Sequence, residues 1–358
     1  MRQCPKNVIN GPCSGYRGAS CEVSGECVFI KVLSGKSINE LRRLFSRVIL
    51  DERFKIKDYI PIPRRPLTLF MKSLNRGDKL IVYEVIFSIN DDVSKVLNDL
   101  RDIRGSDIVY ALADSPLGTL TFDPLALGLM LKKDVDVLDV ILNIPMRNRT
   151  IEALIKYVIT AANTGLRNFL VVTGDWSKNF ENYFTLDSTR AIYLLRLLCD
   201  LGVSINGEVF TVPQYTHVGA VSNPGSEYVF IEVFRSMRKI LAGAEFIITQ
   251  PIYDVSKFKE YLKGLVNEFA EHVPIIPAFA PIISEEYLRI AESLGIKIRR
   301  MDVVKVLKKG DMDAIINKNV ELIQEIIDVA KDVNAIYLST YGNLKLGKLF
   351  VEILRKML

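Results

Sequence analysis

A carboxylate suited to chemistry stands at the end of the run Asn168-Phe-Leu-Val-Val-Thr-Gly-Asp175. Residues 169–172 are apolar, continuous and mostly β-branched or aromatic, which is typical of a buried parallel strand. Gly174 allows a turn or the close approach of a ligand, so we expect Asp175 at the carboxyl end of this strand. In an α/β barrel that end of the strands carries the catalytic residues.

A second carboxylate, Glu84, lies inside the apolar run Ile-Val-Tyr-Glu-Val-Ile-Phe. Burying a carboxylate is costly unless it is paired or functional. Desolvation would raise its pKa, which makes Glu84 a candidate proton donor near neutral pH. The alternative is a structural glutamate held in a salt bridge.

Other polar side chains follow the predicted strands. Asn143, Asn223 and Gln250 each stand at the end of an apolar run. Of these, Gln250 together with Glu84 and Asp175 predicts a polar pocket for a heterocycle that forms hydrogen bonds.

Three basic residues lie on the helix predicted after the fifth strand, namely Arg235, Arg238 and Lys239. They form either a solvated helix face or a clamp on phosphate groups.

Strands and helices alternate from residue 80 to the C-terminus. Strands are predicted at 80–87, 107–112, 137–142, 169–172, 218–221, 246–249, 274–278 and 335–339. Helices are predicted at 91–103, 124–131, 151–163, 188–200, 227–241, 255–269, from 284, at 312–332 and at the C-terminus. This pattern predicts an α/β fold, a (β/α)8 TIM barrel over residues 68–358, and the sequence also allows an extra strand at 208–212. A doubly wound open sheet is the alternative, but no G-x-G-x-x-G follows the first strand.

Residues 1–67 differ from the barrel and are predicted to be a small cysteine-rich module with a helix and a linker. Its cysteines, Cys4, Cys13, Cys21 and Cys27, have the spacing C-x8-C-x7-C-x5-C, without paired C-x2-C knuckles. So short a segment buries little core, and a metal is a common remedy. Structural zinc, an iron–sulfur cluster, and metal-free or disulfide-bonded thiols all remain open, and a structural role is preferred to a redox one. Ser37 is the expected N-cap of a helix over 37–50, and 51–66 is the expected linker.

The composition is that of an ordinary globular protein. The 358 residues are 49% hydrophobic and 25% charged, with a net charge of +5. The sequence has no arginine-rich run that would indicate nucleic-acid binding and no apolar run of 18 residues that would indicate a membrane span. Its N-terminus has no apolar signal core. We therefore expect a cytoplasmic protein. Because the sequence has just two His, a His-rich metal site is nearly excluded. The scarcity of Gln and the abundance of Lys and Ile are weak indications of a thermophilic source.

Several of these stretches resemble the 5,10-methylenetetrahydrofolate reductase family. They are Thr173-Gly174-Asp175, the runs 219–224 and 239–250, and Glu84 in the first strand. The resemblance covers roughly residues 68–345, and the run 242–254 is its most specific part. The N-terminal cysteine pattern resembles a module that accompanies some bacterial and archaeal reductases as a separate subunit or a fused extension. That resemblance favours a metal at the four cysteines.

The resemblance implies a flavin-containing barrel, with FAD or FMN reduced by NAD(P)H or another donor. Hydride then passes to the one-carbon bridge of a reduced folate-type pterin. Glu84 matches the general acid, Asp175 the carboxylate beside flavin and pterin, and Gln250 the amide that contacts folate. The resemblance also implies a substrate wall at Phe279 and flavin contacts at Asn143, Thr173, Gly174, Asp175, Ala220, Asn223, Arg235, Arg238 and Lys239. A homo-oligomer or a partner reductase subunit fits the same family.

The sequence leaves two alternative functions. One is a non-catalytic barrel whose cysteine module serves as an interaction component of a one-carbon complex. The other is a zinc-dependent methyltransferase, which needs thiolates at strand ends. The sequence disfavours the methyltransferase because the only cysteine in the predicted barrel, Cys199, falls in a predicted helix.

Overall fold

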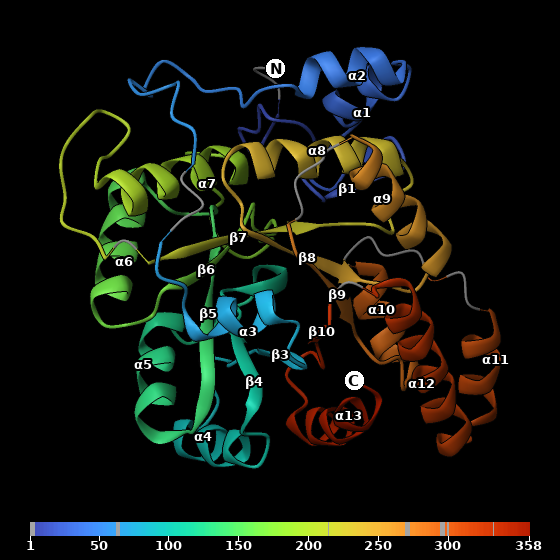
Figure 1. Cartoon of the computed structure of the whole chain (residues 1–358). Helices are drawn as coiled ribbons and strands as arrows, with labels where there is room; N and C mark the ends of the chain where they lie inside the picture. Colours follow the sequence, from blue (N-terminus) through green and yellow to red (C-terminus); the bar gives the residue numbers. More distant parts are fainter. Residues whose placement is uncertain are drawn as a thin grey trace.

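Eight parallel strands close into a barrel in the computed structural model (Figure 1). The structure describes residues 4–61, 65–213, 215–268, 273–293, 298, 301–331 and 333–358. The strands, in barrel order after β10 (Ala335–Leu338), are β3 (Leu80–Val85), β4 (Gly105–Leu112), β5 (Val137–Pro145), β6 (Asn168–Val172), β7 (His217–Ser222), β8 (Phe246–Pro251) and β9 (Ile275–Phe279). All eight predicted strands are confirmed, and so is the (β/α)8 barrel.

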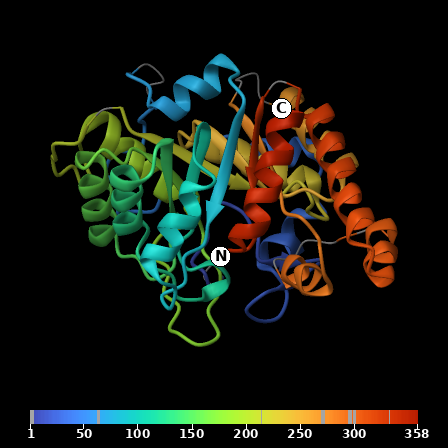
Figure 2. The same cartoon turned by 90° about the horizontal axis from the view of Figure 1, so that it is seen from below.

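Helices surround the barrel and connect its strands. They are α4 (Val93–Arg101), α5 (Pro124–Asp134), α6 (Ile151–Asn163), α7 (Ser188–Arg196), α8 (Val229–Leu241), α9 (Val255–Glu268), α10 (Glu285–Ser293), α11 (Met301–Lys309), α12 (Met312–Val329) and α13 (Leu344–Met357). A short 3-10 turn, η1 (Pro116–Gly118), precedes α5. Seen from below, β3 in cyan lies beside the red C-terminal elements, where the first strand pairs with β10 (Figure 2).

The strands divide the apolar core into two layers. Alternate residues point inward and outward along each strand, so Leu80 and Val82 fill the barrel while Ile81 and Tyr83 pack under the helices. Helix α3 (Leu69–Arg76) adds Phe70 to the inner layer, where its ring meets Phe246 edge-on at 5.1 Å. This helix therefore covers the end of the barrel opposite the carboxyl ends of the strands.

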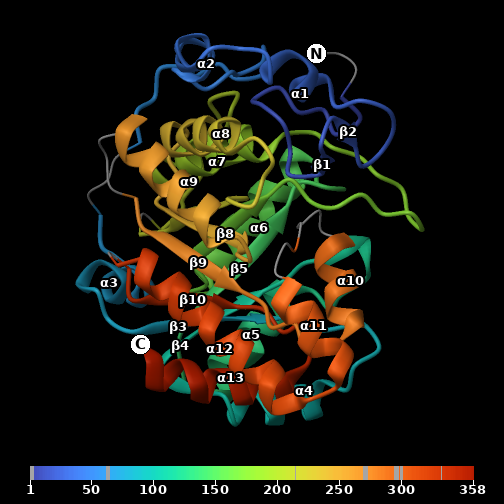
Figure 3. The same cartoon turned by 90° about the vertical axis from the view of Figure 1, so that its right-hand side faces the viewer.

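The N-terminal module, defined here as residues 4–50, packs on the outside of α8 (Figures 1 and 3). It contains the strands β1 (Tyr16–Arg17) and β2 (Ser20–Cys21) and the helices α1 (Val28–Leu33) and α2 (Ile38–Phe45). Ser37 caps α2 in a capping box with Glu40, as its sequence predicts. The rings of Phe45 and Phe234 meet at 6.1 Å within a small apolar core that the module shares with α8.

Some predicted elements differ from the structure. The extra strand at 208–212 is wrong, because only an isolated bridge joins Val203 to Val209 there. The helix at 188–200 divides into α7 and a π-helical segment, η2 (Leu197–Leu201), and the helix at 37–50 ends at Phe45. Helices α1, α3 and α11 were not predicted. Residues 62–64 of the linker, and the predicted helix ends at 269 and 332, lie outside the described residues.

Within the described part of the chain, no helix combines the length and the apolar character that crossing a membrane requires.

Candidate functional site

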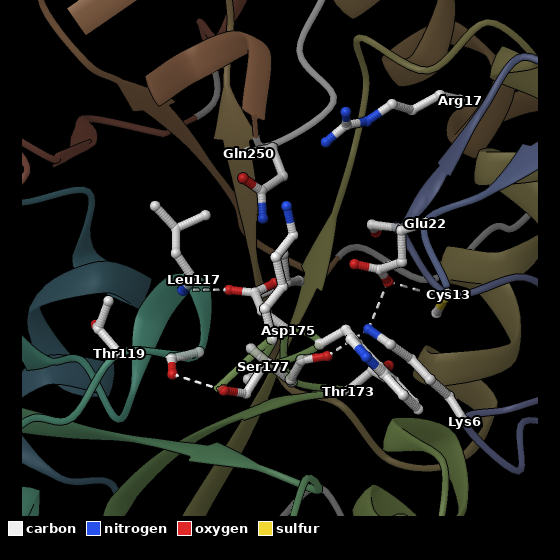
Figure 4. Close-up of a pocket in the computed structure, with 18 of the residues that line it drawn as sticks. Lys6, Cys13, Arg17, Glu22, Leu117, Thr119, Thr173, Asp175, Ser177 and Gln250 are labelled. Carbon is white, nitrogen blue, oxygen red and sulfur yellow. Dashed lines mark hydrogen bonds and ion pairs between the residues drawn. The ribbon is translucent and has the colours of Figure 1, made fainter. Parts of the chain in front are cut away.

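A cavity of about 550 Å³ opens at the carboxyl ends of β6, β7 and β8 (Figure 4). This volume is in the range typical of small-molecule sites. Six predicted site residues line it, namely Thr173, Gly174, Asp175, Arg235, Lys239 and Gln250. The lining does not include the predicted residues Glu84, Asn143, Ala220, Asn223, Arg238 and Phe279.

Asp175 is held by three segments of the chain. The backbone N–H of Leu117 donates to its Oδ2 over 2.7 Å. The preceding Gly174 has φ of +90°, and a Cβ there would lie 3.2 Å from the Cβ of Pro145 and 3.0 Å from that of Arg147. From the N-terminal module, Lys6 Nζ donates to the carbonyl of Gly174 over 2.7 Å. The turn that carries the carboxylate is therefore fixed before any ligand binds.

Glu84 lies on the inner face of β3, one layer above Val82. The phenol of Tyr337 donates to its Oε1 over 2.8 Å, and the hydroxyl of Ser339 donates to its Oε2. Burial of the carboxyl raises the pKa of Glu84, and the negative charge of Asp175 raises it further. The two hydroxyl donors act in the opposite direction because they stabilise the carboxylate. No salt bridge to Glu84 is found among the described residues, so the structural salt-bridge alternative receives no support.

Asn143 and Gln250 complete the inner polar layer. Asn143 follows Ile141 on the inner face of β5, and its Oδ1 is buried without a hydrogen-bond partner in the described ranges. Gln250 follows Ile248 on β8 and lines the cavity. An amide offers both a donor and an acceptor, as the edge of a pterin or flavin ring requires.

The basic residues of α8 are buried, so the solvated-face alternative is wrong. Arg235 donates to Glu232 over 2.7 Å and to the carbonyl of Pro12 over 3.1 Å, and its Nε has no partner among the described residues. Lys239 Nζ donates to the carbonyl of Val221 over 2.5 Å. Burial, with the nearby Arg235 charge, lowers the pKa of Lys239 to about 7.

Arg238 points away from the cavity. Its guanidinium lies over the ring of Phe45, with 4.0 Å to the centroid, and donates to the carbonyl of Leu44. This arrangement ties α8 to the module, and of the three basic residues only Arg235 and Lys239 line the cavity.

Three other predicted residues serve the packing of the barrel. Ala220 is fully buried on the helix-facing side of β7. The backbone N–H of Asn223 donates to Glu232 over 2.7 Å. The ring of Phe279 is fully buried and meets Phe350 of α13 at 5.5 Å, so it faces the helices and not the barrel interior.

The four N-terminal cysteines are free thiols, so the disulfide alternative is wrong for this structure. All four line one small cavity of about 50 Å³, which explains their spacing as a shared cluster. Yet no group of three or more His, Cys, Asp or Glu side chains in the described ranges is arranged to hold a metal ion. As they stand, the thiols do not fit a zinc or iron–sulfur site, and we assign no chemical step to a metal.

Sequence reasoning missed two kinds of site residue. Tyr337 on β10 and Ser339 directly after it contact Glu84 because the last strand pairs with the first. Their alternation along the predicted strand 335–339 is a signal for this contact in a barrel. Lys6, Arg17 and Glu22 line the cavity from the module, and no pattern in the sequence indicates where the module docks.

Two family models match the chain. The model described as methylenetetrahydrofolate reductase matches residues 127–357, and the model described as methylene-tetrahydrofolate reductase C terminal matches residues 1–54. The second match covers the cysteine module.

Curated relatives belong to the same group. Methylenetetrahydrofolate reductase 1 of Schizosaccharomyces pombe is 25% identical over 232 residues, which cover 62% of this chain and 36% of the relative. Methylenetetrahydrofolate reductase 2 of Saccharomyces cerevisiae is 25% identical over 228 residues, which cover 62% of this chain and 37% of the relative. The chain thus spans a little over a third of the length of these relatives.

A solved structure shares the fold. An uncharacterised protein from Clostridium thermocellum that binds two copies of 5-methyl-5,6,7,8-tetrahydrofolic acid superposes with a TM-score of 0.60 at 20% identity. The superposition covers 81% of this chain and 99% of that one.

Proposed function

Because the chain belongs to the methylenetetrahydrofolate reductase family, we propose that it reduces the methylene bridge of a reduced pterin to a methyl group. The substrate is 5,10-methylenetetrahydrofolate or a related methylene-pterin, and the electrons come from NAD(P)H or another donor. The ligand of the Clostridium thermocellum protein belongs to the class of the expected product.

The observation that carries this proposal is the environment of Glu84. A buried carboxyl with a raised pKa, held by Tyr337 and Ser339, is suited to give up a proton near neutral pH. We assign Glu84 to protonate the pterin nitrogen that leaves when the five-membered ring opens. The ring-opened cation is the form that accepts a hydride.

A flavin, FAD or FMN, would supply that hydride when bound. The cavity fits such a group because it combines ring-edge partners with basic residues. Asp175 and Gln250 are the partners for the ring edge. Arg235 and Lys239 are the basic residues, and the Nε of Arg235 has no hydrogen-bond partner in the described ranges. These residues bind and orient, and Asp175 additionally places a negative charge near Glu84.

The test separates the two half-reactions under anaerobic conditions. Glu84→Gln should slow reoxidation of the reduced enzyme by methylenetetrahydrofolate about 100- to 10,000-fold, the usual contribution of a general acid. Reduction by the donor should stay within a few-fold of the wild type. Glu152→Gln, an exposed glutamate on α6, is the matched control and should change neither step. Equal loss of both half-reactions in Glu84→Gln would refute the assignment.

A second measurement distinguishes the non-catalytic alternative. Purified protein that is colourless and cannot be reconstituted with FAD or FMN would favour an interaction subunit of a one-carbon complex. A parallel assay with another reduced methylene-pterin identifies the carrier.

A further inference from the structure

The N-terminal module forms one wall of the reaction cavity (Figure 4). Its contribution to the lining is Lys6, Cys13, Ser14, Gly15, Arg17 and Glu22. The opposite wall is built by Asp175 and the segment that contains Leu117. The module therefore contributes to the cavity, although its composition alone indicates a purely structural role.

This wall is fixed to the barrel at several points. Lys6 is 4% exposed, and its Nζ contacts both the Gly174 carbonyl at 2.7 Å and Glu22 at 2.5 Å. The hydroxyls of Tyr16 and Ser226 share a hydrogen bond of 2.5 Å. Because these contacts join the module to the loops after β6 and β7, the residues between them keep a defined place at the cavity.

The lining carries an excess of positive charge. Its basic members are Lys6, Arg17, Lys178, Arg235 and Lys239, against the acidic members Glu22 and Asp175. Arg17 is exposed, follows Tyr16 on β1, and extends into the cavity in Figure 4. A cavity with this balance favours a ligand that carries an anionic group.

We propose that Arg17 binds an anionic group of the ligand seated in the barrel, so that the module is part of the binding site. The group is the phosphate of the flavin nucleotide or the carboxylate tail of the pterin. This inference rests on the proposed function. A guanidinium suits either group because its planar fork of N–H donors matches two oxygens at once.

The first experiment measures flavin affinity of the apoprotein by fluorescence quenching, with FMN and with riboflavin, which lacks the phosphate. If Arg17 holds the phosphate, Arg17→Ala weakens FMN binding about tenfold or more and leaves riboflavin unchanged. Arg17→Lys retains part of the affinity because it keeps the charge but not the fork. Arg43→Ala, an exposed arginine of α2 outside the cavity lining, is the control and should change nothing.

The second experiment covers the other source of the anionic group. If Arg17 holds the pterin tail, Arg17→Ala leaves both flavin affinities unchanged and raises KM for the pterin with its glutamate tail, with kcat preserved. A tail-less pterin then shows no change in KM.

Both results together decide the inference. Arg17→Ala that binds FMN like the wild type and shows an unchanged KM overturns it, while the proposed function stands. A wild-type protein that binds no flavin overturns the proposed function and this inference with it. Because Arg17 is exposed, Arg17→Ala should keep the unfolding midpoint of the wild type. Measuring that midpoint excludes misfolding as the cause of any loss of binding.

Discussion

The phenol of Tyr337 donates a hydrogen bond of 2.8 Å to Oε1 of Glu84, across the seam where β10 pairs with β3. The general acid assigned to the first strand is thus positioned by the last one. Opening this seam would expose Glu84 to water and remove both of its donors, Tyr337 and Ser339, at the same time.

Replacing Tyr337 should change the pH dependence of pterin reduction. The Tyr337 hydrogen bond stabilises the carboxylate and lowers the pKa of Glu84, so Tyr337→Phe should raise that pKa. Since the acid works when protonated, the alkaline limb of the rate of flavin reoxidation should move to higher pH. Tyr110→Phe is the control, because the Tyr110 hydroxyl donates to the Leu100 carbonyl on the outer side of the barrel. An unmoved alkaline limb in Tyr337→Phe would remove Tyr337 from this role.

Binding of a phosphate-bearing flavin should take up a proton through Lys239. Its pKa is lowered to about 7, so at pH 8 most of the amine is neutral in the unliganded protein. A phosphate in the cavity favours the ammonium form and raises this pKa, so protonation accompanies binding. Calorimetry at pH 8 in buffers of different ionisation enthalpy should show proton uptake with FMN and none with riboflavin. Lys239→Met should abolish it; equal uptake with both flavins would contradict the prediction.

Gly174 and Gly207 form a matched pair for a stability measurement. Their φ angles are +90° and +89°, but a Cβ at Gly174 meets Arg147 at 3.0 Å, whereas one at Gly207 meets nothing within 4 Å. Gly207→Ala should cost about 1–2 kcal/mol through backbone strain alone. Gly174→Ala should cost about 1–3 kcal/mol more, because it adds overpacking. Urea unfolding measures both, and equal losses would show that the Gly174 turn is loosely packed.

Asp187 should anchor the N-terminal module. It caps α7, accepts from the backbone N–H of Ile9 over 2.9 Å, and pairs with the buried Arg190. Asp187→Ala should cost about 3 kcal/mol or more, because a buried charge loses a partner, and should expose the module to proteases. Asp311→Ala removes an exposed cap of α12 and should cost only about 1 kcal/mol. If the two variants lose equal stability and proteolysis does not change, Asp187 acts as a cap only.

The barrel was predictable because its strands are apolar runs at regular spacing and each is buried on both faces. The same regularity placed Glu84 within the first strand and Asp175 and Gln250 at the ends of two others, where the structure has them. Helix α3 escaped prediction because it follows a proline-rich stretch and is only eight residues long. The strand expected at 208–212 does not form because, among the described residues, that segment makes only the isolated bridge from Val209 to Val203.

The residues that interact with the module could not be placed from sequence. Arg235, Arg238 and Lys239 follow a helical pattern that is equally consistent with solvent, with a phosphate or with a docked partner. Only the three-dimensional structure shows that Arg238 stacks on Phe45 while Lys239 faces the cavity. The types of these side chains limit which groups they can bind. Which of those groups each one contacts depends on how the N-terminal module packs against α8.

The contacts that fix the module join residues made at very different times during synthesis. Lys6 forms a hydrogen bond with Gly174, which is 168 positions later in the chain. Pro12 accepts a hydrogen bond from Arg235, which is 223 positions later. At about 5–20 residues per second, the ribosome supplies these partners roughly ten seconds or more after the module has been made. The module therefore cannot make these contacts until the segments around Gly174 and Arg235 have been synthesised.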